Sequence, residues 1–178
     1  MVILGKPPID PCSIAKEIIS AVRRQGKYDR PAWNAAAKRA LRRKADRKRY
    51  LVYPSPGKKG WGEWLCDTVW FTRKEGTIHL AAEVELGGSG DVMFDFQKLL
   101  CVKAPLKVMV YRGRKRGTLL EKRANAESFP DYMEAFDHHM GGEHYLFVQF
   151  GPGRTDHAYL YKVAKDGSAA NVSLQSLI

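Results

Sequence analysis

The segment TIHLAAEVEL, residues 77–86, constrains the fold more than any other part of the sequence. Its apolar residues alternate with other types at a period of two, which is typical of a β-strand with two different faces. Glu83 and Glu85 are then expected on the same side, roughly 6 to 7 Å apart along the strand. Because neighbouring like charges repel each other, the pair is either a solvated outer face or a site that binds a cation.

The segments around this strand predict an α/β fold with a mixed central β-sheet flanked by helices. TVWFT (68–72) precedes it across a short turn, which indicates a hairpin. GGSGD (87–91) is expected to be a loop, and VMFDFQKLLCV (92–102) has a helical period. PLKVMVY (105–111) is a further strand, and a strand–helix–strand crossover favours parallel pairing.

Two helices and one more strand are expected before the hairpin. Asp10 with Pro11 begins a helix that ends at Gly26, and a second helix begins near Asp29 and runs through residue 49. The strand lies in YLVY or EWLCD, on either side of a turn-rich connection.

The C-terminal part is expected to add a helix and a β-hairpin. Residues 118–140 are predicted to be helical with a break near Pro130, HYLFVQF and HAYLYKV to be paired strands, and the tail from residue 165 to be poorly ordered. The chain is interpreted as a single domain, 1–178. Its parts are a basic helical N-terminal part (10–50), a core (50–111) and a C-terminal extension (112–178).

Charge is distributed unevenly along the chain. Residues 1–60 hold 16 Lys and Arg against 4 Asp and Glu, a net charge of +12, whereas residues 61–178 hold 14 against 15, a net charge of −1. A merely solubilising surface would spread the excess, so the N-terminal part is expected to face a polyanion, most simply nucleic acid.

The three cysteines, Cys12, Cys66 and Cys101, are too few and too widely spaced for a disulfide framework or a zinc ribbon. Buried, reduced thiols and a cytoplasmic location are expected. No apolar run has the length of a membrane span, and the N-terminal prolines come too early for a signal peptide.

A third carboxylate is expected near the glutamate pair. Asp67 lies at the start of the preceding strand, and antiparallel pairing brings it close to Glu83. The backbone carbonyl of Val84 adds another oxygen. Such an oxygen-rich group suits Mg²⁺ or Mn²⁺.

This order of elements resembles the PD-(D/E)XK nuclease superfamily, with its restriction-endonuclease-like fold, over residues 10–111. The resemblance implies that Asp67 and Glu83 bind the divalent ion. It places Glu85 where the family usually has lysine, and Lys98 on the following helix is then the candidate for a migrated lysine. The helix-1 acid of the family maps to Glu17. The implied activity is Mg²⁺-dependent hydrolysis of DNA, with Glu85 or Lys98 orienting the attacking water.

The expected partner is DNA, and a homodimer would supply the two sites that cutting both strands of a duplex needs. Phosphates are expected to be bound by arginines of the second helix and of the RGRKRG loop: Arg39, Arg42, Arg43, Arg47, Arg114 and Arg116.

Three alternatives remain open on the sequence alone. The chain could be a nucleic-acid-binding protein of the same fold without catalysis, which the missing motif lysine favours, or a protein-interaction module with a basic tail. The DHHMGGEHY segment, with His138, His139 and His144, could bind zinc. It has no nearby cysteine, so a surface turn or partly buried imidazoles are the favoured interpretation.

Overall fold

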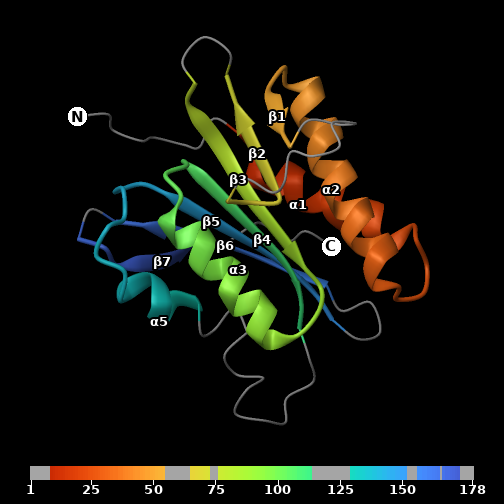
Figure 1. The fold of residues 1–178 in the computed structure, drawn as a ribbon. Coiled ribbons are helices and arrows are strands. Elements are labelled where there is room, and N and C mark those ends of the chain that lie inside the picture. Colours follow the sequence, from red (N-terminus) through yellow and green to blue (C-terminus); the bar gives the residue numbers. More distant parts are fainter. Residues whose placement is uncertain are drawn as a thin grey trace.

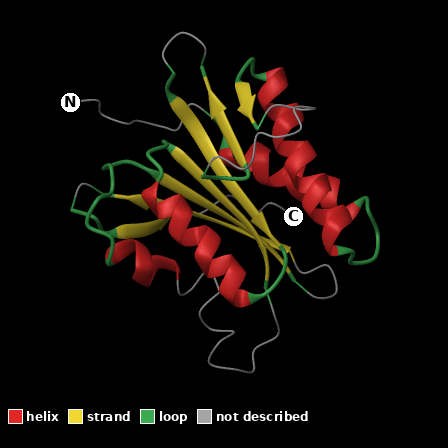
Figure 2. Cartoon of the chain, viewed as in Figure 1, coloured by secondary structure: helices red, strands yellow, loops and turns green. Residues whose placement is uncertain are grey.

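The computed structural model describes residues 9–54, 65–72, 76–113, 129–151, 156–164 and 166–172. They form three layers, with a seven-stranded sheet in the middle (Figure 1). The helices α1 and α2 cover one face of the sheet, and α3 and α5 cover the other, as the red helices in Figure 2 show. This is the α/β class with a mixed, helix-flanked sheet that the sequence predicts.

The strands follow one another across the sheet in chain order. The pairs β1–β2 and β2–β3 are antiparallel, β3–β4 and β4–β5 are parallel, and β5–β6 and β6–β7 are antiparallel. The bounds are β1 Leu51–Tyr53, β2 Thr68–Phe71, β3 Ile78–Glu85, β4 Leu106–Arg112, β5 His144–Phe150, β6 Asp156–Val163 and β7 Ala169–Val172.

Helix caps explain where α1 (Pro11–Arg23) and α2 (Arg30–Arg47) begin. Asp10 accepts a hydrogen bond from the Cys12 N–H, and Asp29 accepts one from the Ala32 N–H, each with a proline in the first turn. Gly26 has φ +78° just beyond α1, a conformation that glycine adopts without strain. Both predicted helices are confirmed.

The alternation of β3 places its side chains in two different cores. Leu80, Ala82 and Val84 face α1 and α2, whereas Ala81 faces α3. Glu83 therefore faces α3, because it follows Ala81 at the strand period. The predicted hairpin of β2 and β3 and the parallel crossover through α3 (Ser89–Cys101) are confirmed.

Three local predictions are wrong. The GGSGD segment is not a loop throughout, because α3 already begins at Ser89, with Gly88 as its cap and Asp91 in its first turn. The described part of 118–140 is helical only over α5 (Phe129–Glu134), with Pro130 inside its first turn, where proline is tolerated. The tail contributes β7, which pairs with the outer edge of β6.

The C-terminal hairpin of β5 and β6 is confirmed, but its placement is not that of an appendage. β5 pairs in parallel with β4, so it lies in the centre of the sheet. Its side chain Leu146 is buried in the core beneath α1 and α2, whereas Tyr145 and Phe147 are buried in the core beneath α3 and α5. The residues of the RGRKRG loop after Gly113 lie outside the described residues.

A buried ion pair crosses the core from β4 to the segment before β5. Lys107 is 1% exposed, and its Nζ lies 2.8 Å from both Glu143 Oε2 and the Tyr145 hydroxyl. Burial lowers the pKa of Lys107, while Glu143 opposes that shift. His139 joins the same cluster, with Nδ1 3.2 Å from Glu143 Oε2 and Nε2 2.7 Å from the Met133 carbonyl.

The cysteines are unpaired, as expected, but only Cys66 is fully buried, and Cys101 is exposed. None of the helices in the described part of the chain is long and apolar enough to cross a membrane.

Candidate active site

Asp67, Glu83, Asp95 and Lys98 form a carboxylate–lysine cluster where β2 begins and β3 ends. The Asp67 N–H donates to Glu83 Oε2 (3.3 Å), and the Val84 N–H donates to Asp67 Oδ2 (2.9 Å). The predicted proximity of Asp67 to Glu83 is thus confirmed. Both side chains are buried, Glu83 to 1% exposure.

Lys98 reaches this acid pair from α3. Its Nζ lies 2.7 Å from Glu83 Oε1 and 2.8 Å from Asp95 Oδ1, one helical turn earlier. Although burial opposes its charge, the contacts with Asp95 and Glu83 raise the pKa of Lys98. The lysine is therefore a charged group held against both carboxylates.

Burial dominates the protonation of Glu83. It raises the pKa of this carboxyl to about 8, with Lys98 opposing the rise and the neighbouring Asp67 and Asp95 adding to it. The burial of Cys66 itself, together with the charge of Glu83, raises the pKa of the Cys66 thiol to about 12. Cys66 is thus a protonated thiol packed beside the carboxylates.

Basic residues of α2 pair with the carboxylates of Asp67 and Glu85. Lys38 forms an ion pair with Asp67, and Arg30 lies 2.9 Å from Glu85 Oε1. The Gly87 N–H also donates to Glu85. The described contacts of Glu85 are therefore with Arg30 and Gly87, and the structure does not bring it to Asp67 or Lys98.

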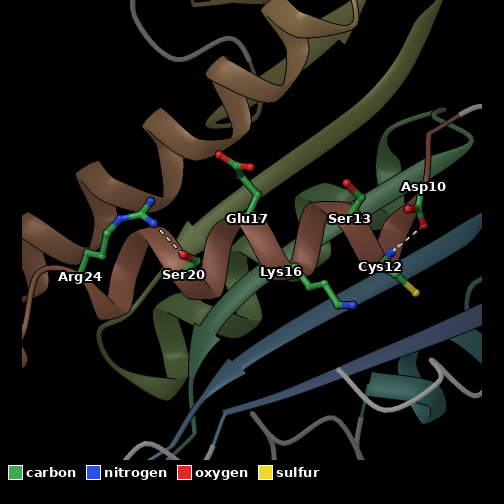
Figure 3. Close-up of a pocket in the computed structure, with 7 residues that line it drawn as sticks. All are labelled: Asp10, Cys12, Ser13, Lys16, Glu17, Ser20 and Arg24. Atoms are coloured by element: carbon green, nitrogen blue, oxygen red, sulfur yellow. Dashed lines mark hydrogen bonds between the residues drawn. The ribbon is translucent and has the colours of Figure 1, made fainter. Parts of the chain in front are cut away.

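Glu17 belongs to a different place on the molecule. It contacts Arg47 (2.8 Å) and Arg43 (3.6 Å) of α2, and the hydrogen bond from Arg47 lowers its pKa. It also lines a hollow along α1, in which Arg24 donates to Ser20 Oγ (2.7 Å) (Figure 3). None of the residues that line this hollow belongs to the carboxylate–lysine cluster. The lining residues are Asp10, Cys12, Ser13, Lys16, Glu17, Ser20 and Arg24.

The arginines expected to bind phosphates differ in their surroundings. Arg39 is exposed, whereas Arg42 donates to the Pro54 carbonyl (2.8 Å), and Arg43 and Arg47 pair with Glu17. Arg114 and Arg116 lie outside the described residues. Of the four arginines in this set that the structure describes, three thus make contacts within the fold.

Three residues of this region were missed by the sequence analysis: Lys38, Arg30 and Asp95. The spacing of Asp95 and Lys98, three residues apart on one helix, was a signal that they share a face. Nothing in the sequence tied Lys38 or Arg30 to carboxylates on the sheet, because these contacts depend on how α2 packs.

The oxygens predicted to bind a metal are only partly brought together by the fold. Within the described ranges, no group of three or more His, Cys, Asp and Glu side chains is arranged to hold a metal ion. The acid pair alone still fits Mg²⁺, which is usually bound by one or two carboxylates and keeps several waters. Glu83 Oε1 is buried and lies 2.7 Å from the Lys98 ammonium, so a metal ion held by the acid pair would share this oxygen with Lys98.

Comparisons with known proteins add no relative. No protein-family model, no curated protein and no solved structure matches the chain. A function for this chain is therefore inferred from the class of the fold and the geometry of the cluster.

Proposed function

We propose that the chain is a divalent-metal-dependent nuclease of restriction-endonuclease-like fold that hydrolyses DNA phosphodiester bonds. The observation that carries the proposal is the convergence of Asp67, Glu83 and Lys98 at one point, where β2 begins and β3 ends. The order of a helical layer, an antiparallel meander, a crossover helix and a parallel strand also supports it.

Asp67 and Glu83 would hold Mg²⁺ or Mn²⁺, beside the Val84 backbone. Bound there, the ion would supply charge stabilisation for the scissile phosphate and a more acidic water. Burial and the neighbouring carboxylates raise the pKa of Glu83, and a bound cation would favour the charged form of this carboxyl.

Lys98 would act on the reacting groups. Asp95 and Glu83 fix its ammonium at the cluster, where it can donate a hydrogen bond to the attacking water or to a phosphate oxygen. This assigns the water-orienting role to Lys98 rather than to Glu85, whose carboxylate is paired with Arg30.

The basic N-terminal part would supply sequence-independent affinity for the DNA backbone. A homodimer and a cytoplasmic location belong to the same proposal, the first because cleavage of both strands needs two sites, the second because the thiols are unpaired.

A plasmid-nicking assay with added Mg²⁺ or Mn²⁺ tests the proposal. We expect Lys98→Met and Glu83→Gln to reduce nicking by roughly 10²- to 10⁴-fold, the range for loss of a catalytic acid–base or electrostatic group. Lys103→Met is the matched control, because Lys103 is an exposed lysine just beyond α3. Native nicking that persists in EDTA, or that survives in both cluster variants, contradicts the proposal.

A second candidate function is nucleic-acid binding without catalysis. It is favoured by the observation that Asp67, Glu83 and Glu85 each have a cationic partner within the protein. In that case the native chain binds DNA with a salt-dependent affinity, shows no nicking with any divalent ion, and takes up no Mg²⁺ in calorimetry.

A further inference from the structure

Two apolar side chains stand exposed beside the carboxylate–lysine cluster. Only four large hydrophobic side chains are exposed among the described residues, and two of them are here. Phe94, 65% exposed, lies one helical turn before Lys98, and Leu65, 50% exposed, lies two residues before Asp67.

The packing of α3 gives no reason for an aromatic residue at position 94. The helix buries Val92, Phe96 and Leu99 against the sheet, whereas Phe94 falls on the outward stripe with the exposed residues Asp91 and Gln97. Exposed positions on an amphipathic helix are ordinarily polar. A ring that remains 65% exposed also gains little from burial in the folded chain.

The position of the Phe94 ring is linked to the cluster. Lys98 Nζ lies 5.7 Å from the ring centroid, while the same atom is 2.7 Å from Glu83 Oε1. A planar apolar surface therefore lies directly beside the ammonium that would contact a phosphate.

Leu65 is turned outward by an unusual backbone conformation. Its φ is +54°, a region that bulky L-residues rarely adopt. The next residue, Cys66, is fully buried, so the chain exposes Leu65 immediately before it enters the cluster.

We infer that Phe94 is a stacking platform for an unpaired base of single-stranded DNA, next to the phosphate held at the carboxylate–lysine cluster, with Leu65 as a second apolar contact. The inference rests on the proposed function for the position of the phosphate. Aromatic side chains stack on any base, whereas a duplex offers its base faces only after unstacking. The preferred substrate is therefore DNA with a single-stranded segment at the scissile phosphate.

Two measurements on the same samples test this inference. The first measures binding in Ca²⁺ of a single-stranded oligonucleotide and of the matching blunt duplex. Each carries 2-aminopurine, and its fluorescence reports the binding. The second is cleavage of both substrates in Mg²⁺. The variants are Phe94→Leu, which removes the ring, and Phe94→Trp, which keeps a stacking surface, with Val172→Ala as an exposed apolar control on β7.

We expect tighter binding of the single strand and quenching of 2-aminopurine by the native chain. Phe94→Leu should weaken single-strand binding by roughly 5- to 150-fold and abolish the quenching, the range for losing one stacked base, while Phe94→Trp restores both. Equal binding of single strand and duplex, or unchanged quenching in Phe94→Leu, overturns the inference even where native cleavage supports the proposed function. Ring-dependent quenching without cleavage supports the stacking platform and contradicts the nuclease.

Discussion

Replacing Glu83 by glutamine should change how the stability of the protein depends on pH. In the folded chain the pKa of this carboxyl is about 8, against an ordinary value of 4.5, chiefly because it is buried. Between these values the folded state holds a proton that the unfolded state has released. The free energy of unfolding of the native chain therefore falls as pH rises from 4.5 to 8 and levels off above 8.

The size of the effect follows from the same two values. One pKa unit corresponds to about 1.4 kcal/mol, so a rise from 4.5 to about 8 corresponds to a loss of order 5 kcal/mol across this range. Glutamine has similar shape and does not titrate. The Glu83→Gln variant should consequently gain stability relative to the native chain as pH rises, by an amount approaching this figure at pH 9.

Urea denaturation in metal-free buffer from pH 5 to pH 9 measures the difference. Glu134→Gln, which removes an exposed carboxyl of α5, is the matched control and should follow the native profile. Titrating groups distant from the carboxylate–lysine cluster contribute equally to both proteins and cancel in the comparison. If the native and Glu83→Gln curves run parallel over this range, Glu83 is not a buried carboxyl of raised pKa and the reasoning is refuted.

Three further predictions concern the rest of the fold. Lys107→Met should lower the free energy of unfolding by about 3 to 5 kcal/mol, because it leaves Glu143 buried without its cation; urea denaturation measures this, and adding Glu143→Gln should recover part of the loss. Burial lowers the pKa of His144, so the unfolded state takes up more protons and the protein loses stability as pH falls through 6.5. Thermal denaturation of His144→Gln should show a weaker acid dependence, and an unchanged one contradicts this. Asp10→Ala should cost about 1 kcal/mol by removing the cap of α1, whereas Asp10→Asn, which keeps an acceptor, should cost clearly less.

The helix starts and the β2–β3 hairpin could be predicted from the sequence, because each depends on residues that are close together along the chain. Asp10 and Asp29 are caps because their side chains accept from the first turn of a helix, which requires only neighbouring residues. The β2–β3 hairpin followed from its short turn, and with it came the contact of Asp67 with Glu83. The site could therefore be located from one hairpin.

The remaining parts depended on packing between distant segments. β5 lies beside β4 in parallel, although more than thirty residues separate them, and no periodicity specifies the neighbour of a buried strand. Lys107 occupies a strand position that sequence alone would place in solvent, and only the proximity of Glu143 and Tyr145 makes its burial tolerable. The tail strand β7 is mostly exposed, so its sequence carries no apolar signal.

The positive charge of the N-terminal part is partly used inside the protein. Arg23 pairs with Asp156 of β6, Arg30 with Glu85 and Lys38 with Asp67, so the helical layer is tied to the sheet by charge. Unequal charge along the sequence is therefore not in itself a measure of the surface offered to a polyanion.

The salt dependence of DNA binding distinguishes basic side chains that contact phosphates from those that are held by contacts within the protein. Each phosphate neutralised on a duplex contributes about 0.9 to the slope of log K against log salt. Among the described residues, Arg39 alone of the four expected α2 arginines has no polar partner, whereas Arg42 is held by Pro54 and the other two by Glu17. We expect Arg39→Gln to lower the slope by about one and Arg42→Gln to leave it unchanged while reducing stability. Equal changes in slope for both variants would show that the internal contact of Arg42 opens on binding, and that the basic face of α2 acts as a whole.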